Sequence, residues 1–165
     1  SSKAFDWYRK AANLGNVDAM NNMGYMYASG FRRLMSAESA LYWYQKAAAL
    51  NHPKAMYNIG ALYAEGRGVE RDLHKCAEWL TKAALLGETT AQFNLGNMYY
   101  LGKGVERDLV EAEKWYRLAE EKGHRNAKRF RKHLLEHLDI AELHTNFVIR
   151  LIGDQWNDSF EIYFL

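Results

Sequence analysis

The chain has 165 residues and a net charge of +2, with 48% hydrophobic and 25% charged residues. This composition is ordinary for a soluble globular protein and argues against disorder, and no run approaches the roughly 20 apolar residues of a membrane span. The net charge is too small to predict a nucleic-acid or membrane partner by itself.

One sequence segment recurs along the chain. It reads AQFNLGNMYYLGKGVERD from Ala91, AMYNIGALYAEGRGVERD from Ala55, and more loosely AMNNMGYMYASG from Ala19. The spacing is constant, since 55 minus 19 and 91 minus 55 both give 36, and Ala127 opens a fourth, incomplete copy. A period in this range is the signature of a repeat array, whose core lies between neighbouring repeats.

The repeats predict helix pairs in chain order. Residues 4–14 are expected to form the second helix of a repeat whose first helix is absent, because Trp7 is followed at the same spacing by Trp43, Trp79 and Trp115. Each complete repeat then has the pattern of a helix, a Gly-containing loop, a second helix and a turn. We therefore expect an all-α solenoid of αα-hairpins over residues 1–130, with a partial repeat at 1–16, full repeats at 17–52, 53–88 and 89–124, and a partial repeat from 125.

Glycines and apolar residues at fixed positions indicate how the helices pack. Gly24, Gly60 and Gly96 lie inside the first helices, where Gly costs about 1 kcal/mol relative to Ala, so each is expected to allow close approach of the paired second helix. The expected core positions are Tyr27, Tyr63 and Tyr99, with Ala40, Trp43, Ala47 and their equivalents.

Helix ends are also marked in the sequence. Gly66 and Gly102 are expected to end the first helices in the left-handed conformation. Asp72 and Asp108 are placed to cap the second helices that come next. These signals predict the same boundaries in both repeats.

Two segments depart from the pattern. In the first complete repeat FRRLMS (31–36) replaces RGVERD, and Phe31 and Leu34 either pack against the next repeat, the commoner outcome, or form an exposed contact patch. Residues 131–165 are expected to form a capping helix and an apolar tail. The tail fits a helix around Phe147 and Val148 but alternates like a strand at FEIYFL, and it either folds back on the cap or supports self-association.

The repeat motif resembles known helical repeats. Leu95, Gly96, Tyr99, Ala112 and Tyr116 follow a pattern shared with the tetratricopeptide repeat, while the 36-residue period and the G-x-G-V loop resemble the Sel-one-like repeat (SLR) family. The resemblance covers residues 1 to about 130. It implies a right-handed superhelix without catalytic activity that organises protein complexes, so we expect neither a cofactor nor a small-molecule substrate.

By similarity to such solenoids, the first helices line the concave face and would bind a protein or peptide. The exposed positions expected there combine amides with aromatic rings: Asn22, Tyr25, Tyr57, Asn58, Phe93, Asn94, Asn97 and Tyr100. Rigid aromatic rings bury area at low entropic cost, and amides can pair with a partner's backbone. The three asparagines that recur in every repeat can instead tie neighbouring helices together.

A zinc-dependent hydrolase is one alternative function. His133, Glu136 and His137 form H-x-x-E-H, in which two His one turn apart bind zinc and the Glu activates water. A third ligand would come from Glu142 or His144, but the chain leaves no room for the large domain expected around such a site. A solvated helix face is the simpler interpretation, and we expect no metal.

Nucleic-acid binding through the basic segment 122–133 is a second alternative. Its cations are Lys122, His124, Arg125, Lys128, Arg129, Arg131 and Lys132. Aromatic residues hardly interrupt the run, and Glu111, Glu113, Glu120 and Glu121 lie close to it in the sequence. We therefore interpret it as a charged helix surface that could steer an acidic partner.

The cysteine content and the first residues give little information on the compartment. Cys76 is the one cysteine in the sequence, and it aligns with Ala40 and Ala112, so we expect a small buried hydrophobe. The chain begins without Met in the middle of a repeat, so we expect that residues have been removed before it. Localisation is then cytoplasmic by default, or periplasmic or secreted if a signal segment was removed.

Overall fold

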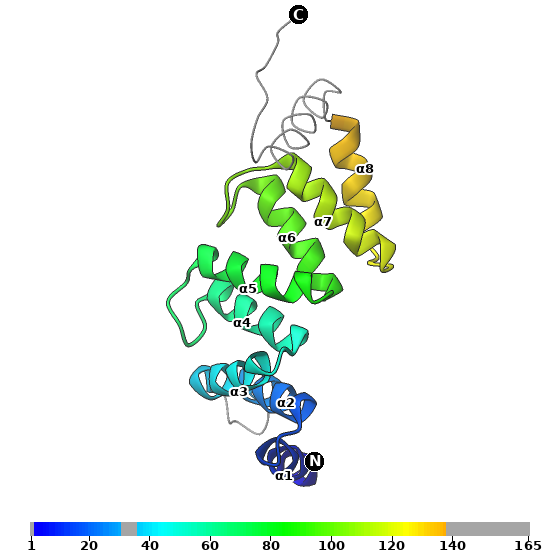
Figure 1. Cartoon of the computed structure of the whole chain (residues 1–165). Coiled ribbons are helices and arrows are strands. Elements are labelled where there is room, and N and C mark those ends of the chain that lie inside the picture. The colour runs from blue at the N-terminus through cyan, green and yellow to red at the C-terminus, as the bar shows by residue number, and fades with distance from the viewer. Residues whose placement is uncertain (1, 31–35, 138–165) are drawn as a thin grey trace, which may run out of the picture.

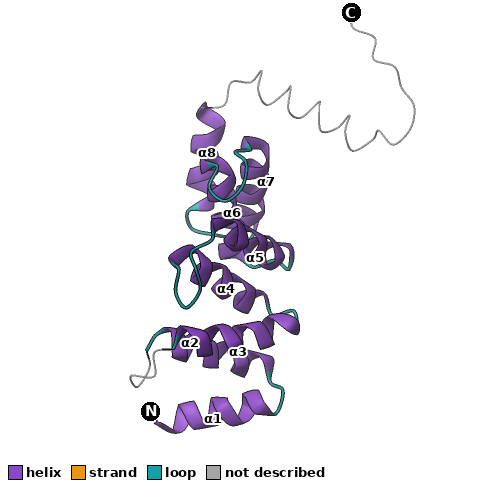
Figure 2. Cartoon of the chain, turned by 90° about the vertical axis from the view of Figure 1, so that its left-hand side faces the viewer, coloured by secondary structure: helices purple, strands orange, loops and turns teal. Residues whose placement is uncertain are grey.

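The computed structural model describes residues 2–30 and 36–137, and the regular secondary structure of this part is entirely α-helical, with loops between the helices (Figures 1 and 2). Its helices are α1 Ser2–Asn13, α2 Val17–Ala28, α3 Ala37–Ala49, α4 Pro53–Glu65, α5 Leu73–Leu85, α6 Thr89–Leu101, α7 Leu109–Glu121 and α8 Ala127–His137. The expected all-α repeat solenoid is confirmed. No helix in these two segments is both long and apolar enough to cross a membrane.

Consecutive helices pack in pairs, and the pairs stack along one direction (Figure 1). The first helices α2, α4 and α6 pack on the second helices α3, α5 and α7 of their own repeats. Each second helix then packs on the first helix of the next repeat, as α3 does on α4 and α5 on α6. An apolar core that includes Met23, Ile59 and Leu95 therefore continues from one repeat to the next.

The expected helix ends are present in the second and third repeats. Gly66 and Gly102 end α4 and α6 with φ of 68° and 65°, in the left-handed region where residues other than Gly are strained. Asp72 and Asp108 cap α5 and α7, and their side chains accept bonds from backbone N–H groups in the first turn at 3.0 and 2.9 Å. The loop sequence therefore fixes both the end of one helix and the start of the next.

The glycines inside the first helices allow close packing, as expected. A Cβ atom added to each would approach a side chain of the paired second helix. The contacts are Gly24 with Tyr44 at 2.5 Å, Gly60 with Leu80 at 3.3 Å and Gly96 with Tyr116 at 2.7 Å. The first and third repeats thus place a tyrosine ring directly against a helix backbone, whereas the second repeat has a looser contact.

One of the recurring tryptophans does not lie in the core. Trp43 and Trp115 are buried, with exposed fractions of 8% and 4%, but Trp7 is 69% exposed. The expectation that Trp7 is a core residue was therefore wrong. Helix α1 packs mainly on α2, and among the described residues no first helix of its own repeat covers the side that carries Trp7.

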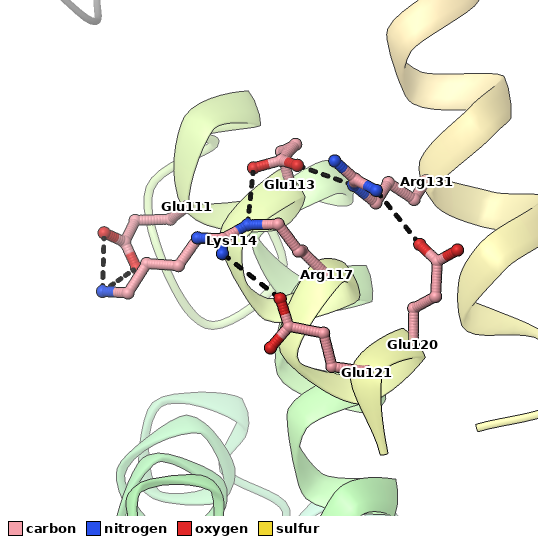
Figure 3. A network of polar contacts seen from close by, with 7 residues as sticks. All are labelled: Glu111, Glu113, Lys114, Arg117, Glu120, Glu121 and Arg131. Atoms are coloured by element: carbon pink, nitrogen blue, oxygen red, sulfur yellow. Dashed lines mark hydrogen bonds and ion pairs between the residues drawn. The ribbon is translucent and has the colours of Figure 1, made fainter. Parts of the chain in front are cut away.

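Helix α8 closes the described array, and an ion-pair network fixes it to α7 (Figure 3). Arg131 of α8 lies between two carboxylates of α7, with Nε 2.7 Å from Glu113 Oε1 and Nη1 3.1 Å from Glu120 Oε2. Leu134 is buried, with an exposed fraction of 2%. Apolar contact and charge pairing therefore act together at this end.

Several expectations fall on residues that lie outside those described. They concern Phe31 and Leu34 of the first loop, the helix or strand around Phe147, Val148 and FEIYFL, and the third zinc ligand at Glu142 or His144. Self-association through the apolar tail belongs to the same group. All of these stay predictions.

Candidate binding face on the first helices

Most of the predicted site residues lie on one set of helices and are at least half-buried. We call them, without Phe93, the first-helix face: Asn22, Tyr25, Tyr57, Asn58, Asn94, Asn97 and Tyr100 of α2, α4 and α6. Tyr25 is the most exposed of them, at 63%. The others are half-buried between neighbouring helices, so their polar atoms are partly used within the protein.

Contacts between residues 37 positions apart link the first helices of successive repeats. Asn58 Nδ2 donates to Asn21 Oδ1 at 3.1 Å, and Asn94 Nδ2 donates to the Tyr57 hydroxyl at 3.5 Å. Between α6 and α8 a ring contact has the same 37-residue spacing, with the centroids of Phe93 and Phe130 5.1 Å apart. Asn58 and Asn94 therefore tie neighbouring helices together, which was the alternative role expected for them.

Phe93 does not belong to an exposed face. Its exposed fraction is 9%, so the expectation that it lies on the surface was wrong. The His124 ring stacks on it at 4.3 Å between centroids, and the rings of Phe130 and Tyr116 pack against it at 5.1 and 5.7 Å. In the third repeat, the turn before α8 and α8 itself cover the position that Tyr57 occupies in the second.

Buried tyrosines hold the polar groups of this face in fixed positions. Burial raises the pKa values of Tyr44 and Tyr116 well above their ordinary value of 10. Burial also raises the pKa of Tyr57, and the hydrogen bond from Asn94 offsets part of this effect. The phenols are therefore protonated donors at neutral pH, and Tyr116 donates to Asn97 Oδ1 at 2.7 Å.

A hollow of about 400 Å³ opens among α4, α5 and α6. We call it the α4–α6 hollow. It is lined by Tyr57, Ala61, Ala64, Glu65, Arg71, Leu73, Cys76, Leu80, Asn94, Asn97, Met98 and Lys103. Three residues of the predicted site, Tyr57, Asn94 and Asn97, thus come together around one depression. Its volume falls within the range usual for small binding pockets.

The hollow exists because the second repeat has small residues where its neighbours have larger ones. Ala61 stands at the position of Tyr25 and Asn97. Leu80 stands at the position of two tyrosines, one of which is Tyr116. At the equivalent positions of the third repeat, the Tyr116 hydroxyl donates a hydrogen bond to Asn97. Ala61 and Leu80 were not among the site residues expected from the sequence, although a comparison of the repeats position by position contains this signal.

The zinc hypothesis gains no support from the described residues. No group of three or more His, Cys, Asp or Glu side chains in this part of the chain is arranged to hold a metal ion. Glu136, the expected base, lies 3.6 Å from Lys132 Nζ in an ion pair one helical turn away. Such a pair is typical of a solvated helix face.

Several cations of the basic segment make contacts within the protein. Arg131 pairs with two glutamates of α7, Lys132 with Glu136, and Lys122 Nζ donates to the Gly87 carbonyl at 2.9 Å. The Arg129 guanidinium lies 5.4 Å from the centre of the Phe130 ring. These contacts fit a charged helix surface, and nothing in the described structure supports nucleic-acid binding.

Comparisons with known proteins agree on the family. The Sel1 repeat matches residues 1–16, 17–52, 53–88 and 89–124. No curated protein matches the chain. Among solved structures, a Sel1 repeat protein from Oxalobacter formigenes is 32% identical with a TM-score of 0.70, over 76% of this chain and 95% of the other.

Two further structures have similar folds. A protective antigen of uropathogenic Escherichia coli that displays an SLR fold is 38% identical, with a TM-score of 0.69, over 73% of this chain and 26% of the other. The cysteine-rich protein B of Helicobacter pylori is 26% identical, with a TM-score of 0.63, over 78% of this chain and 92% of the other. The chain belongs to the Sel1 repeat family, whose members are generally non-catalytic scaffolds for protein interactions.

Proposed function

We propose that this chain is a non-catalytic scaffold that binds a segment of another protein on its first-helix face. The observation that carries the proposal is the α4–α6 hollow, about 400 Å³ in volume, which opens between Tyr57, Asn94 and Asn97. A concave site with an apolar floor and a few polar groups at its edge is the usual form of a binding pocket.

The chemistry of the face suits a peptide ligand. Tyr25 supplies a largely exposed ring, and aromatic rings contribute strongly to interfaces because they lose little rotamer freedom on binding. The amides of Asn94 and Asn97 carry both donors and acceptors, which can pair with the backbone of an extended segment.

The helices behind the face are closely packed, which favours binding. The side chains stand on packed helices, and the Tyr116 hydroxyl holds Asn97 at 2.7 Å. Groups that are fixed before a ligand arrives lose less conformational entropy when it binds. A repeat array of this kind can therefore change its ligand by changing a few side chains while the helices stay in place.

Affinity capture with matched variants tests the proposal. The face variant combines Tyr25→Ala with Ala61→Arg, which removes the exposed ring and fills the hollow. The control combines Tyr42→Ala with Gln45→Arg on α3, where both side chains are exposed. Circular dichroism verifies that helicity is unchanged in both variants.

The unaltered chain and the control should retain the same protein from an extract of the source cells, as measured by quantitative mass spectrometry. The face variant should lose that protein. Equal retention by the face variant, or equal loss by the control, would contradict binding at the first-helix face.

A further inference from the structure

We propose that the α4–α6 hollow takes one bulky apolar side chain of an extended peptide segment, and that acidic residues lie next to that side chain in the ligand. This inference rests on the proposed function and specifies its ligand. Three features of the hollow support it: its shape, its amides and its charges.

The shape indicates a large apolar side chain. The second repeat has Ala61 and Leu80 at positions where the third repeat has Asn97 and Tyr116, so smaller side chains stand where the third repeat has a phenol ring, and both line the hollow. Ala64, Cys76 and Met98 complete an apolar lining, in addition to Leu80. A ring or a branched aliphatic side chain fits such a space and is removed from water there.

The amides at the edge indicate an extended backbone. Asn97 Oδ1 is occupied by the Tyr116 hydroxyl, so its amide N–H groups remain to donate to a carbonyl of the ligand. Asn94 uses Nδ2 toward Tyr57, so its Oδ1 remains as an acceptor for a ligand N–H. The two asparagines are three residues apart on α6 and therefore face the same side of the helix. They offer one donor and one acceptor to consecutive backbone groups of a bound segment.

The charges at the edge indicate an acidic ligand. Arg71 and Lys103 line the hollow and are exposed. The Nε of Arg71 donates to the Ala64 carbonyl at 3.1 Å, which holds the guanidinium beside the opening. The one carboxylate of the lining, Glu65, pairs with Arg67 at 3.3 Å. Two cations therefore remain to attract carboxylates of the ligand.

Peptide selection tests this inference directly. A library of random octapeptides displayed on phage is selected against the immobilised full chain, and the enriched peptides are synthesised for affinity measurements by fluorescence polarisation. We expect enriched sequences to combine one Phe, Leu, Ile, Met or Trp with neighbouring Asp or Glu. Replacing the apolar residue by Ala should weaken binding about tenfold or more.

Variants that fill the hollow provide the structural control. Ala61→Asn with Leu80→Tyr gives the second repeat the pair found at Asn97 and Tyr116 in the third, so this variant should keep its fold and lose at least about tenfold in affinity. If the variant does not fold, Ala64→Tyr fills the opening with a single change. The control Tyr42→Ala should leave the affinity unchanged.

Charge is tested separately. Arg71→Gln with Lys103→Gln should lower the affinity of the acidic peptides and reduce its dependence on salt, because two favourable charge contacts are lost. Enrichment of basic peptides instead would overturn the inference.

The outcomes separate the inference from the proposed function. Peptides that bind the filled variant normally but lose affinity with Tyr25→Ala would overturn the inference and leave the first-helix face as the binding surface. Peptides that lose affinity only with Tyr42→Ala would overturn both. A selection that enriches no peptide would also count against both.

Discussion

The substitution Gly96→Ala tests whether the inner glycines exist for close packing. A Cβ at this position would lie 2.7 Å from the ring of Tyr116, which is buried and fixed by its hydrogen bond to Asn97. Such overpacking costs about 3 kcal/mol, and the better helix propensity of Ala returns about 1 kcal/mol. The expected net loss in the free energy of unfolding is therefore about 2 kcal/mol.

Gly60→Ala is the matched control, because the same substitution meets a looser contact in the second repeat. Its Cβ would lie 3.3 Å from the end of the Leu80 side chain and 3.3 Å from the Cys76 carbonyl oxygen. Gly96 has the same carbonyl contact, with Ala112 O at 3.3 Å, so the two positions differ in the side chain that the methyl group meets. A small shift of Leu80 relieves its contact, so the gain in helix propensity should leave stability nearly unchanged or raise it by up to about 1 kcal/mol. Urea unfolding followed by circular dichroism measures both values.

A double-mutant cycle identifies the cause. In a Tyr116→Leu background, which reproduces the second repeat, Gly96→Ala should become nearly neutral, so the coupling free energy between the two positions should be about 2 kcal/mol. Equal losses for Gly60→Ala and Gly96→Ala, or an absence of coupling, would refute the packing argument.

Three further predictions concern α8, the buried thiol and a helix cap. Arg131→Met leaves the carboxylates of Glu113 and Glu120 without their shared partner and should lower the free energy of unfolding by about 2 kcal/mol in urea titrations. The loss should be smaller at about 1 M salt than at low salt, and an equal loss under the two conditions would contradict the ion-pair explanation. Burial raises the pKa of the Cys76 thiol from 9.0 to about 11. At about pH 8 its thiolate fraction should therefore be about 100-fold lower than that of an unperturbed thiol. A thiol reagent should label the native chain correspondingly more slowly than the urea-unfolded chain. Because this pKa is higher in the folded state, the stabilising contribution is complete below pH 9.0 and is lost as the pH rises through about 11; constant stability over that interval would contradict the shift. Asp108→Ala removes the acceptor for the Glu111 N–H and should cost about 1 kcal/mol in thermal unfolding, whereas Asp108→Asn should cost much less.

Much of the fold is predictable because the same local sequence signals recur in several repeats. Gly66 and Gly102 recur with Asp72 and Asp108 at constant spacing, and both glycines adopt the left-handed conformation while both aspartates cap a helix. Each signal depends on residues close in sequence, so one copy confirms the interpretation of the other. Local chemistry therefore sufficed for the helix boundaries.

The candidate site was less predictable because the burial of a side chain depends on which later elements pack over it. Phe93 has the same position in its repeat as Tyr57, but the rings of His124 and Phe130 cover Phe93, whereas the amide of Asn94 meets Tyr57. Trp7 shows the opposite case, since it shares its position with buried tryptophans and is 69% exposed. The burial of a repeat position therefore depends on the side chains that its neighbouring elements supply.

The sequence contains a signal for the α4–α6 hollow, but the periodicity of the helices does not reveal it. Ala61 and Leu80 are ordinary helix residues when each is considered alone. Their importance becomes clear when they are compared with the larger residues at the same positions in the other repeats. Two side chains on paired helices, one on α4 and one on α5, are then smaller than their equivalents. In a repeat protein, differences between copies are therefore more informative about binding than the shared motif.

Site-specific photocrosslinking tests the central claim most directly. A photoreactive phenylalanine analogue is placed at Tyr25 or at Tyr100 on the first-helix face and, as a control, at Tyr42 on α3, where the side chain is 51% exposed. We predict that the partner captured from the source extract crosslinks at the two first-helix positions and not at Tyr42. Crosslinking at Tyr42 alone would contradict the claim that this protein binds its partner on the first helices.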